Sequence, residues 1–90
     1  MPRREVNIVN SRGLHARASA KFVNIVSELP AGIDVRVAKD GYEAAGGSIL
    51  GLMMLGAAKG DTVEIVVEGP GAETVLDELY VLVRDGFGED

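Results

Sequence analysis

Hydrophobic and polar residues alternate along three stretches of the chain, residues 5–9, 33–37 and 62–68. A period of two is typical of a strand that buries one face. Asp40-Gly41, after the second stretch, is a two-residue hairpin signal and predicts a further short strand at residues 42–45. The pattern therefore predicts four strands.

Elsewhere the apolar residues recur at spacings of three and four, the period of an amphipathic helix. This spacing predicts a first helix that starts at Ala16 and ends before Pro30. It also predicts a short, very apolar helix at residues 49–55 and a longer one at residues 72–84. We expect residues 86–90 to form a loose tail.

The elements follow one another as strand, helix, strand, strand, helix, strand and helix. Strands that bury one face under helices form an α+β sandwich. Because 90 residues leave no room for a second core, we expect one domain over residues 1–90.

The composition excludes several classes of site. The chain has no cysteine, so it can hold no disulfide, thiolate nucleophile or zinc–thiolate centre. We find no P-loop, acidic metal loop or histidine pair, and we expect neither a metal nor a cofactor. No apolar run approaches the ~20 residues that span a bilayer. We see no signal peptide, and we expect a soluble cytoplasmic protein without membrane insertion.

The net charge of −5 is unevenly distributed. Residues 1–39 contain seven Lys or Arg and three Asp or Glu, whereas residues 40–90 contain two and eleven. An acidic chain is a poor nucleic-acid binder, so we expect no such partner. The basic half holds the only histidine and could attract an anion or an acidic partner.

That histidine, His15, lies where a turn leads into the first predicted helix. Free backbone N–H groups and the positive end of the helix dipole meet there and suit an anion. Arg17 adds donors that match phosphate oxygens, and Gly13 would let a bulky partner approach closely. A nucleophilic imidazole beside an anion site is what transient phosphorylation of histidine requires. The residues alone leave open the more ordinary interpretation, a surface histidine near a solvated arginine.

Ser48 precedes the short apolar helix and is a good N-cap residue. That helix is too apolar for a small domain to bury entirely, so we expect an exposed patch that can dock a partner. A phosphate on Ser48 would be tolerated by the helix N-terminus and would place about two negative charges beside the patch. From the residues alone, the structural cap is the favoured role.

Two segments resemble one known family. Gly13-Leu14-His15-Ala16-Arg17, followed by Ala20, Phe22 and Val23, resembles the active-site segment of the HPr phosphocarrier proteins of the bacterial phosphotransferase system (PTS). Residues 48–60 resemble the regulatory serine segment of the same family. The resemblance covers nearly the whole chain, including the order of the elements.

The resemblance implies an open-faced β-sandwich of order βαββαβα, with a four-stranded antiparallel sheet covered on one side by three helices. It implies that His15 accepts a phosphoryl group from phospho-enzyme I, which draws it from phosphoenolpyruvate. His15 would pass the group to an EIIA domain, with Arg17 supporting it. In the family Nδ1 carries the group. The chain would be a phosphohistidine carrier, expected to be a monomer, rather than a free-standing catalyst.

The resemblance also implies a regulatory site and a docking surface. Ser48 matches the position phosphorylated by HPr kinase/phosphorylase where that enzyme exists. The shared docking surface of the partners would comprise Ala16, Ala20, Ile49, Leu50 and Met53.

One departure concerns Ala18, where many family members have proline. The segment after Arg17 looks more like the nitrogen-related (NPr-like) branch, which leaves sugar transport and nitrogen regulation both open as the downstream role. Ala18 has an N–H that proline lacks. We therefore predict that Ala18→Pro changes the lifetime or reactivity of phosphorylated His15.

Two alternatives belong to other functional classes. One is a regulatory binding module of the same fold, controlled by Ser48 phosphorylation without transport-linked transfer. Histidine at position 15 favours the carrier, because such a regulator needs no nucleophile there. The other is a small-molecule-binding domain resembling the ferredoxin-like type, for which the pattern indicates no pocket.

Overall fold

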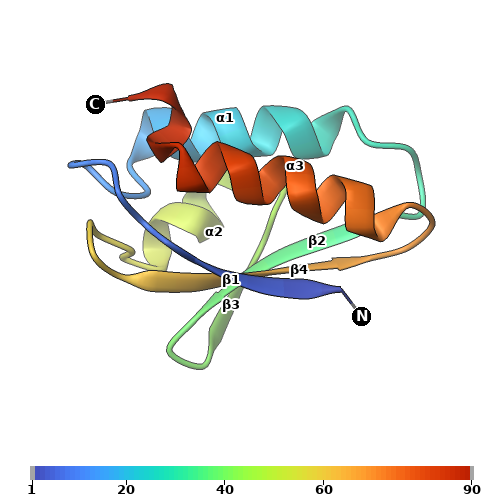
Figure 1. Cartoon of the computed structure of the whole chain (residues 1–90), viewed down its shortest axis with the longest axis horizontal. Coiled ribbons are helices and arrows are strands. Elements are labelled where there is room, and N and C mark those ends of the chain that lie inside the picture. Colours follow the sequence, from blue (N-terminus) through green and yellow to red (C-terminus); the bar gives the residue numbers. More distant parts are fainter. Residues whose placement is uncertain (1, 90) are drawn as a thin grey trace.

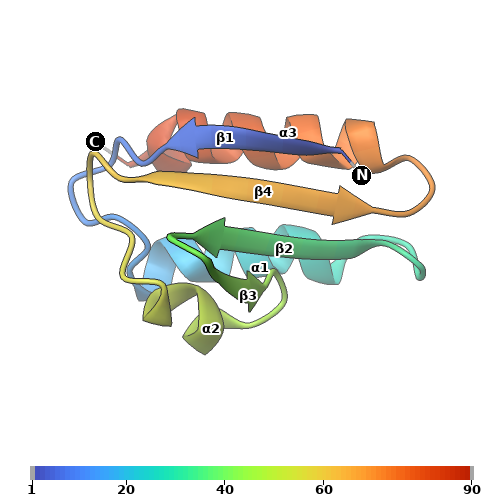
Figure 2. The ribbon, with the colours of Figure 1, turned by 90° about the horizontal axis from the view of Figure 1, so that it is seen from below.

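Three helices cover one face of a four-stranded sheet in the computed structural model of the chain, which describes residues 2–89 (Figure 1). The strands are β1 (Arg3–Asn7), β2 (Asp34–Lys39), β3 (Tyr42–Ala45) and β4 (Thr62–Glu68). They lie side by side in the order β1-β4-β2-β3, and each neighbouring pair is antiparallel (Figure 2). The predicted α+β open-faced sandwich is confirmed.

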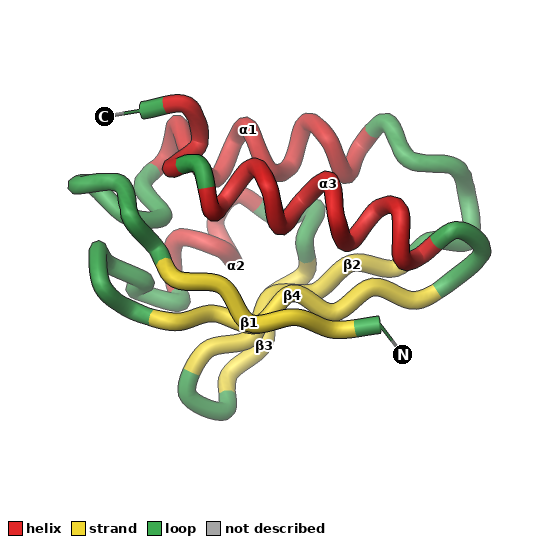
Figure 3. The backbone as a smooth tube through the Cα atoms, viewed as in Figure 1, coloured by secondary structure: helices red, strands yellow, loops and turns green. Residues whose placement is uncertain are grey.

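The helices are α1 (Ala16–Ser27), α2 (Ile49–Met54) and α3 (Ala72–Arg84) (Figure 3). α1 and α3 lie across the sheet, and the short α2 lies near β3 (Figures 1 and 2). None of these helices, within residues 2–89, is long and apolar enough to cross a membrane.

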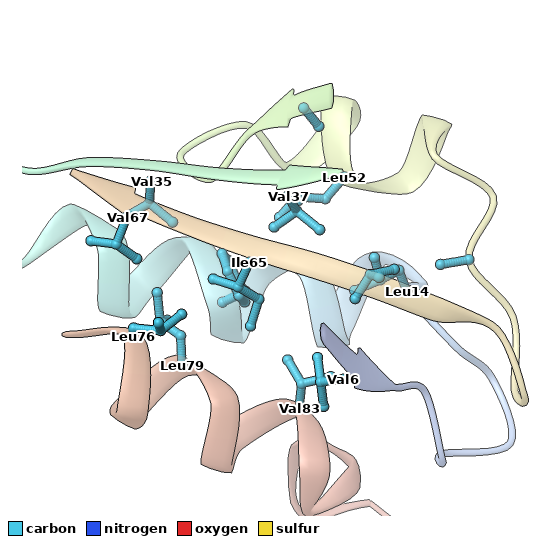
Figure 4. Close-up of a cluster of buried hydrophobic side chains, with 14 of the residues drawn as sticks. Val6, Leu14, Val35, Val37, Leu52, Ile65, Val67, Leu76, Leu79 and Val83 are labelled. Carbon is cyan, nitrogen blue, oxygen red and sulfur yellow. The ribbon is translucent and has the colours of Figure 1, made fainter. Parts of the chain in front are cut away.

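The core lies between the sheet and the helices (Figure 4). Alternate residues of β4 point into it, and Ile65 and Val67 are completely buried. Phe22 of α1 and Leu79 of α3 meet them from the helical layer, each at most 1% exposed. Burial of such a side chain contributes roughly 1.5–3 kcal/mol, so the alternation seen in the sequence drives the packing of the sheet.

The turn between β2 and β3 follows from its sequence. Asp40 and Gly41 have φ angles of 52° and 85°. Two consecutive left-handed residues make the hairpin turn whose twist matches that of the flanking strands. The Asp-Gly prediction is therefore confirmed.

The first strand begins at Arg3, two residues earlier than the alternation predicted. Arg3 and Arg4 pair with Val66 and Ile65 of β4, and the Arg4 guanidinium lies 3.6 Å from the ring centroid of Tyr80 in α3. Stacking of the guanidinium group on an aromatic face stabilises a charged residue in the strand, at a position that the hydrophobic alternation did not include.

The prediction of a loose tail is wrong for residues 86–89. Gly86–Gly88 form a turn of 3-10 helix, in which Phe87 is buried to 1% exposure. Lys21 of α1 donates from Nζ to the Phe87 carbonyl at 2.6 Å. The buried Phe87 side chain and the bond from Lys21 hold the segment, although its sequence has no periodicity. Asp90 lies outside the described residues.

Candidate functional site

His15 is the N-cap of α1, as its position in the sequence predicted. Its backbone is extended (φ −76°, ψ −179°), and its carbonyl oxygen accepts the Ser19 N–H at 2.9 Å. Its Nδ1 accepts the Arg17 backbone N–H at 3.3 Å. The ring is therefore held at the helix N-terminus with Nδ1 facing the free N–H groups of the first turn.

The other ring nitrogen faces the C-terminal segment. Nε2 of His15 lies 2.7 Å from Oε2 of Glu89, a residue 74 positions away in the sequence. An ionised carboxylate only accepts hydrogen bonds, so Nε2 carries the proton in this pair. Nδ1 then has the unprotonated lone pair of the ring, which accepts the Arg17 N–H. For the neutral ring, the two contacts select the tautomer with its proton on Nε2.

Glu89 is held in its charged form. Burial of its side chain, only 14% exposed, would raise the pKa of this carboxyl group. Hydrogen bonds from His15 and Asn10 and the charge of Lys21 outweigh burial and bring the pKa of Glu89 below its usual range. Glu89 is thus an anion at neutral pH.

Asn10 connects the tail to the turn before His15. Its buried side chain donates from Nδ2 to Glu89 Oε1 at 3.1 Å and to the Gly13 carbonyl at 2.9 Å. Both neighbours are acceptors, so the amide nitrogen has to face them. The contact fixes Glu89 relative to the loop that carries His15.

Three cationic residues surround a hollow beside this pair. Arg12, Arg17 and Lys21, together with Gly88 and Glu89, line a space of about 310 Å³. Neither Arg12 nor Arg17 forms a salt bridge with any residue from 2 to 89, although Glu89 borders the same space. Their free guanidinium donors suit an anion with several oxygens, such as a phosphoryl group.

Gly13 does not have the role that its sequence position suggested. It is buried and has a φ of 62°. A Cβ atom there would lie 2.3 Å from the Ala57 carbonyl oxygen. Glycine at this position lets the turn before His15 pack on the residues after α2, and it leaves no opening for a partner.

Ser48 caps α2 as predicted, because its Oγ accepts the Gly51 N–H at 2.9 Å. The side chains that follow it face outward: Ile49 is 41% exposed, Leu50 67% and Met53 40%. Ala16 is exposed and Ala20 half-buried on α1, which packs directly against α2 (Figure 1). The residues expected to form a docking surface thus lie on two adjacent helices.

Ala18 is completely buried. Its N–H finds no acceptor among residues 2–89. The extra donor that distinguishes alanine from proline is therefore not at the surface, and it can act on the site only through its dipole in the first helical turn.

Four residues of this site were not singled out from the sequence: Asn10, Arg12, Lys21 and Glu89. A local signal existed for Lys21, which lies one helical turn after Arg17 and so faces the same side. Glu89 had none, because only the folding of the tail brings it to His15. Within residues 2–89 no three potential metal ligands gather in one place.

Comparison with known proteins agrees with this geometry. The family model described as "PTS HPr component phosphorylation site" matches residues 2–85. The chain is 37% identical to the phosphocarrier protein HPr of Cupriavidus necator, over 99% of this chain and 98% of that protein. It is 36% identical to the phosphocarrier protein NPr of Shewanella violacea, over 96% and 92%.

A solved structure shows the same architecture over the full length. HPr from Thermoanaerobacter tengcongensis superposes with a TM-score of 0.91 at 34% identity, covering 100% of this chain and 99% of that one. Fold, motif and whole-chain similarity agree, and the chain belongs to the HPr family of phosphocarrier proteins.

Proposed function

We propose that His15 accepts a phosphoryl group from phospho-enzyme I, which is charged by phosphoenolpyruvate, and passes it to an EIIA domain. The chain acts in this scheme as a monomeric single domain and as a carrier rather than a free-standing catalyst. The lack of cysteine fits work in a reducing compartment such as the cytoplasm.

The observation that supports this proposal is the orientation of the His15 ring. Nδ1 presents its lone pair to the N-terminus of α1, where it accepts the backbone N–H of Arg17, and Glu89, the partner of Nε2, lines a hollow together with Arg12 and Arg17. When Nδ1 attacks phosphorus, the N–P bond forms and the bond to the donor breaks, its electron pair leaving with the donor. The helix N–H groups and Arg17 would bind the phosphoryl oxygens during the transfer.

Incubation with phosphoenolpyruvate and enzyme I tests the carrier function. We expect an acid-labile phosphate on the wild-type protein and none on His15→Ala. Arg17→Ala should be labelled more slowly, whereas Arg36→Ala, which removes an exposed arginine of β2 paired with Asp34 and Glu43, should match the wild type. An unlabelled wild type, or full labelling of His15→Ala, would refute the proposal.

We further propose that phosphorylation of Ser48, by HPr kinase/phosphorylase where that enzyme exists, blocks docking on Ala16, Ala20, Ile49, Leu50 and Met53. Its support is the placement of the Ser48 hydroxyl at the start of a helix whose apolar side chains are exposed. Ser48→Asp keeps a good cap and adds a charge. We expect it to fold normally and to accept the phosphoryl group from enzyme I more slowly. An unchanged rate would contradict the proposal that a negative charge at Ser48 blocks docking.

The alternative is a regulatory module controlled through Ser48, without transport-linked transfer. We prefer the carrier because Nδ1 of His15 has its lone pair at the helix N-terminus, as attack on a phosphoryl group requires. The two differ in one measurement: only a carrier transfers label from His15 to an EIIA domain. The chain is similar to relatives named HPr and to relatives named NPr. Sugar transport and nitrogen regulation are distinguished by comparing the rates of phosphoryl transfer to an EIIA domain of a sugar transporter and to a nitrogen-related EIIA domain.

A further inference from the structure

The contact between Glu89 and the far side of the His15 ring has no place in the scheme above. Glu89 Oε2 lies 2.7 Å from Nε2, while the nucleophilic Nδ1 faces away towards Arg17. The carboxylate is thus bonded to the ring nitrogen that does not take the phosphoryl group, although it borders the same hollow as Arg12 and Arg17. It can act on the reaction through the imidazole ring.

We infer that Glu89 is a positioning residue that holds the Nε2 proton of His15 before, during and after phosphorylation. The inference rests on the proposed transfer through Nδ1 and adds the group that prepares the ring for it. Its role corresponds to that of a carboxylate that orients a histidine from behind.

The tail that carries Glu89 is fixed firmly enough for this role. Phe87 anchors it in the core, Lys21 donates to the Phe87 carbonyl at 2.6 Å, and Asn10 binds the second oxygen of Glu89 at 3.1 Å. Asn10 also binds the Gly13 carbonyl, so the same side chain ties the tail to the loop before His15. Both side chains of the pair are largely buried, 21% exposed for His15 and 14% for Glu89. A hydrogen bond sheltered in this way is weakened little by solvent.

The position of the ring proton in each transfer step explains why a carboxylate beside Nε2 is useful. Attack by the Nδ1 lone pair leaves the ring with a phosphoryl group on Nδ1, a proton on Nε2 and a positive charge. The carboxylate of Glu89 stabilises that charge. In the onward transfer the N–P bond breaks and its electron pair returns to Nδ1, giving a neutral imidazole. Without the Nε2 proton the leaving group would be an imidazolate anion, which is far more basic and leaves poorly.

Other charges near the ring act in the opposite direction. Arg17 and Lys21 of α1 and Arg12 of the preceding turn all favour loss of a ring proton. Among the described side chains that line this hollow, Glu89 is the only anion. Apart from the phosphoryl group itself, Glu89 is therefore the group in this hollow that favours a proton on Nε2 once His15 is phosphorylated.

The test measures this proton directly. Wild type, Glu89→Gln and the control Glu78→Gln, an exposed glutamate of α3, are phosphorylated with potassium phosphoramidate, which needs no enzyme I. The ring signals of His15 are then followed by NMR as the pH is raised; they are unambiguous because the chain has a single histidine. We expect the proton affinity of Nε2 to fall about tenfold or more in Glu89→Gln, in line with the loss of a charged hydrogen-bond partner. Glu78→Gln should match the wild type.

The rate of transfer to an acceptor EIIA domain gives a second readout. Its decline at high pH should begin at lower pH in Glu89→Gln than in the wild type, whereas a merely structural loss would lower the rate equally at every pH. An unchanged Nε2 titration would overturn the inference even if the carrier function stands. Faster phosphorylation of Glu89→Gln would also overturn it, because Glu89 would then obstruct the site. If the glutamine variant does not fold, Glu89→Asp takes its place, and an unchanged titration there would count equally against the inference.

Discussion

Gly13 and Ala57 are in direct backbone contact beside the site. The Leu14 N–H donates to the Ala57 carbonyl at 2.9 Å, and a Cβ on Gly13 would lie 2.3 Å from that same oxygen and 2.9 Å from Cα of Ala58. The turn that carries His15 is thus seated on the segment that follows α2. The two segments carrying the family motifs are coupled through this contact.

Gly13→Ala should be strongly destabilising for that reason. The φ of 62° costs a non-glycine residue roughly 1–2 kcal/mol, and the clash with backbone atoms adds to it. We expect the free energy of unfolding in urea to fall by about 2 kcal/mol or more. Gly47→Ala is the matched control, because Gly47 has no positive φ and its Cβ would meet nothing within 4 Å. Equal stabilities of the two variants would contradict the packing role of Gly13.

Ser48→Ala measures how much the cap of α2 contributes to stability, independently of any phosphorylation of Ser48. Loss of the 2.9 Å bond to the Gly51 N–H should cost about 1 kcal/mol of unfolding free energy. Ser48→Asp should keep most of the stability, because aspartate caps equally well. Thermal and urea unfolding of both variants measure this, and an alanine variant as stable as the wild type would show that the cap is dispensable.

Phe87→Ala tests the tail as part of the core. Removal of a buried phenyl ring should cost about 3–5 kcal/mol, and the contact between Glu89 and His15 should be lost with it. Tyr42→Ala, which removes an aromatic ring that is 75% exposed, should change the unfolding free energy by only about 0.5 kcal/mol. If the tail did not contribute to stability, Phe87→Ala and Tyr42→Ala would change the free energy of unfolding by similar amounts.

Ala18→Pro should shorten the lifetime of phosphorylated His15. The substitution breaks no hydrogen bond found among residues 2–89, yet it removes one N–H dipole from the positive end of α1. Hydrolysis of the phosphorylated protein at constant pH measures the lifetime. Equal hydrolysis and transfer rates in the wild type and in Ala18→Pro would contradict this prediction.

The stability that Glu89 contributes should depend on pH. The pKa of Glu89 is lowered in the folded state by the hydrogen bonds from His15 and Asn10 and by Lys21, against the effect of burial. A lowered folded pKa means that this contribution is complete above the unfolded value of about 4.3 and is lost as the pH falls through the folded pKa. The stability difference between wild type and Glu89→Gln should thus be largest near neutral pH and shrink in acid. A difference that is constant with pH would indicate that only the shape of the side chain matters.

Local sequence signals predicted most of the elements correctly. The β3, β4 and α3 ranges match the predicted residues, and the caps at His15 and Ser48 lie where the sequence placed them. Each of these depends on neighbours within a few positions: alternation, helical spacing, a capping side chain or an Asp-Gly turn. The start of β1 was missed because its first two residues pair with Val66 and Ile65 of β4, which are distant in the sequence.

The sequence by itself determined the fold class, the helix start at His15 and the apolar face after Ser48, since periodicity and caps are written in adjacent residues. Only the tertiary structure decided which tautomer His15 adopts. It did so by burying Phe87 and bringing Glu89 across 74 positions to Nε2. The same folding placed Arg12 and Lys21 with Arg17 around one hollow, and it turned Gly13 into a packing residue. The physical reason is that these contacts join segments whose separation along the chain carries no periodic signal, so they form only when the core is complete.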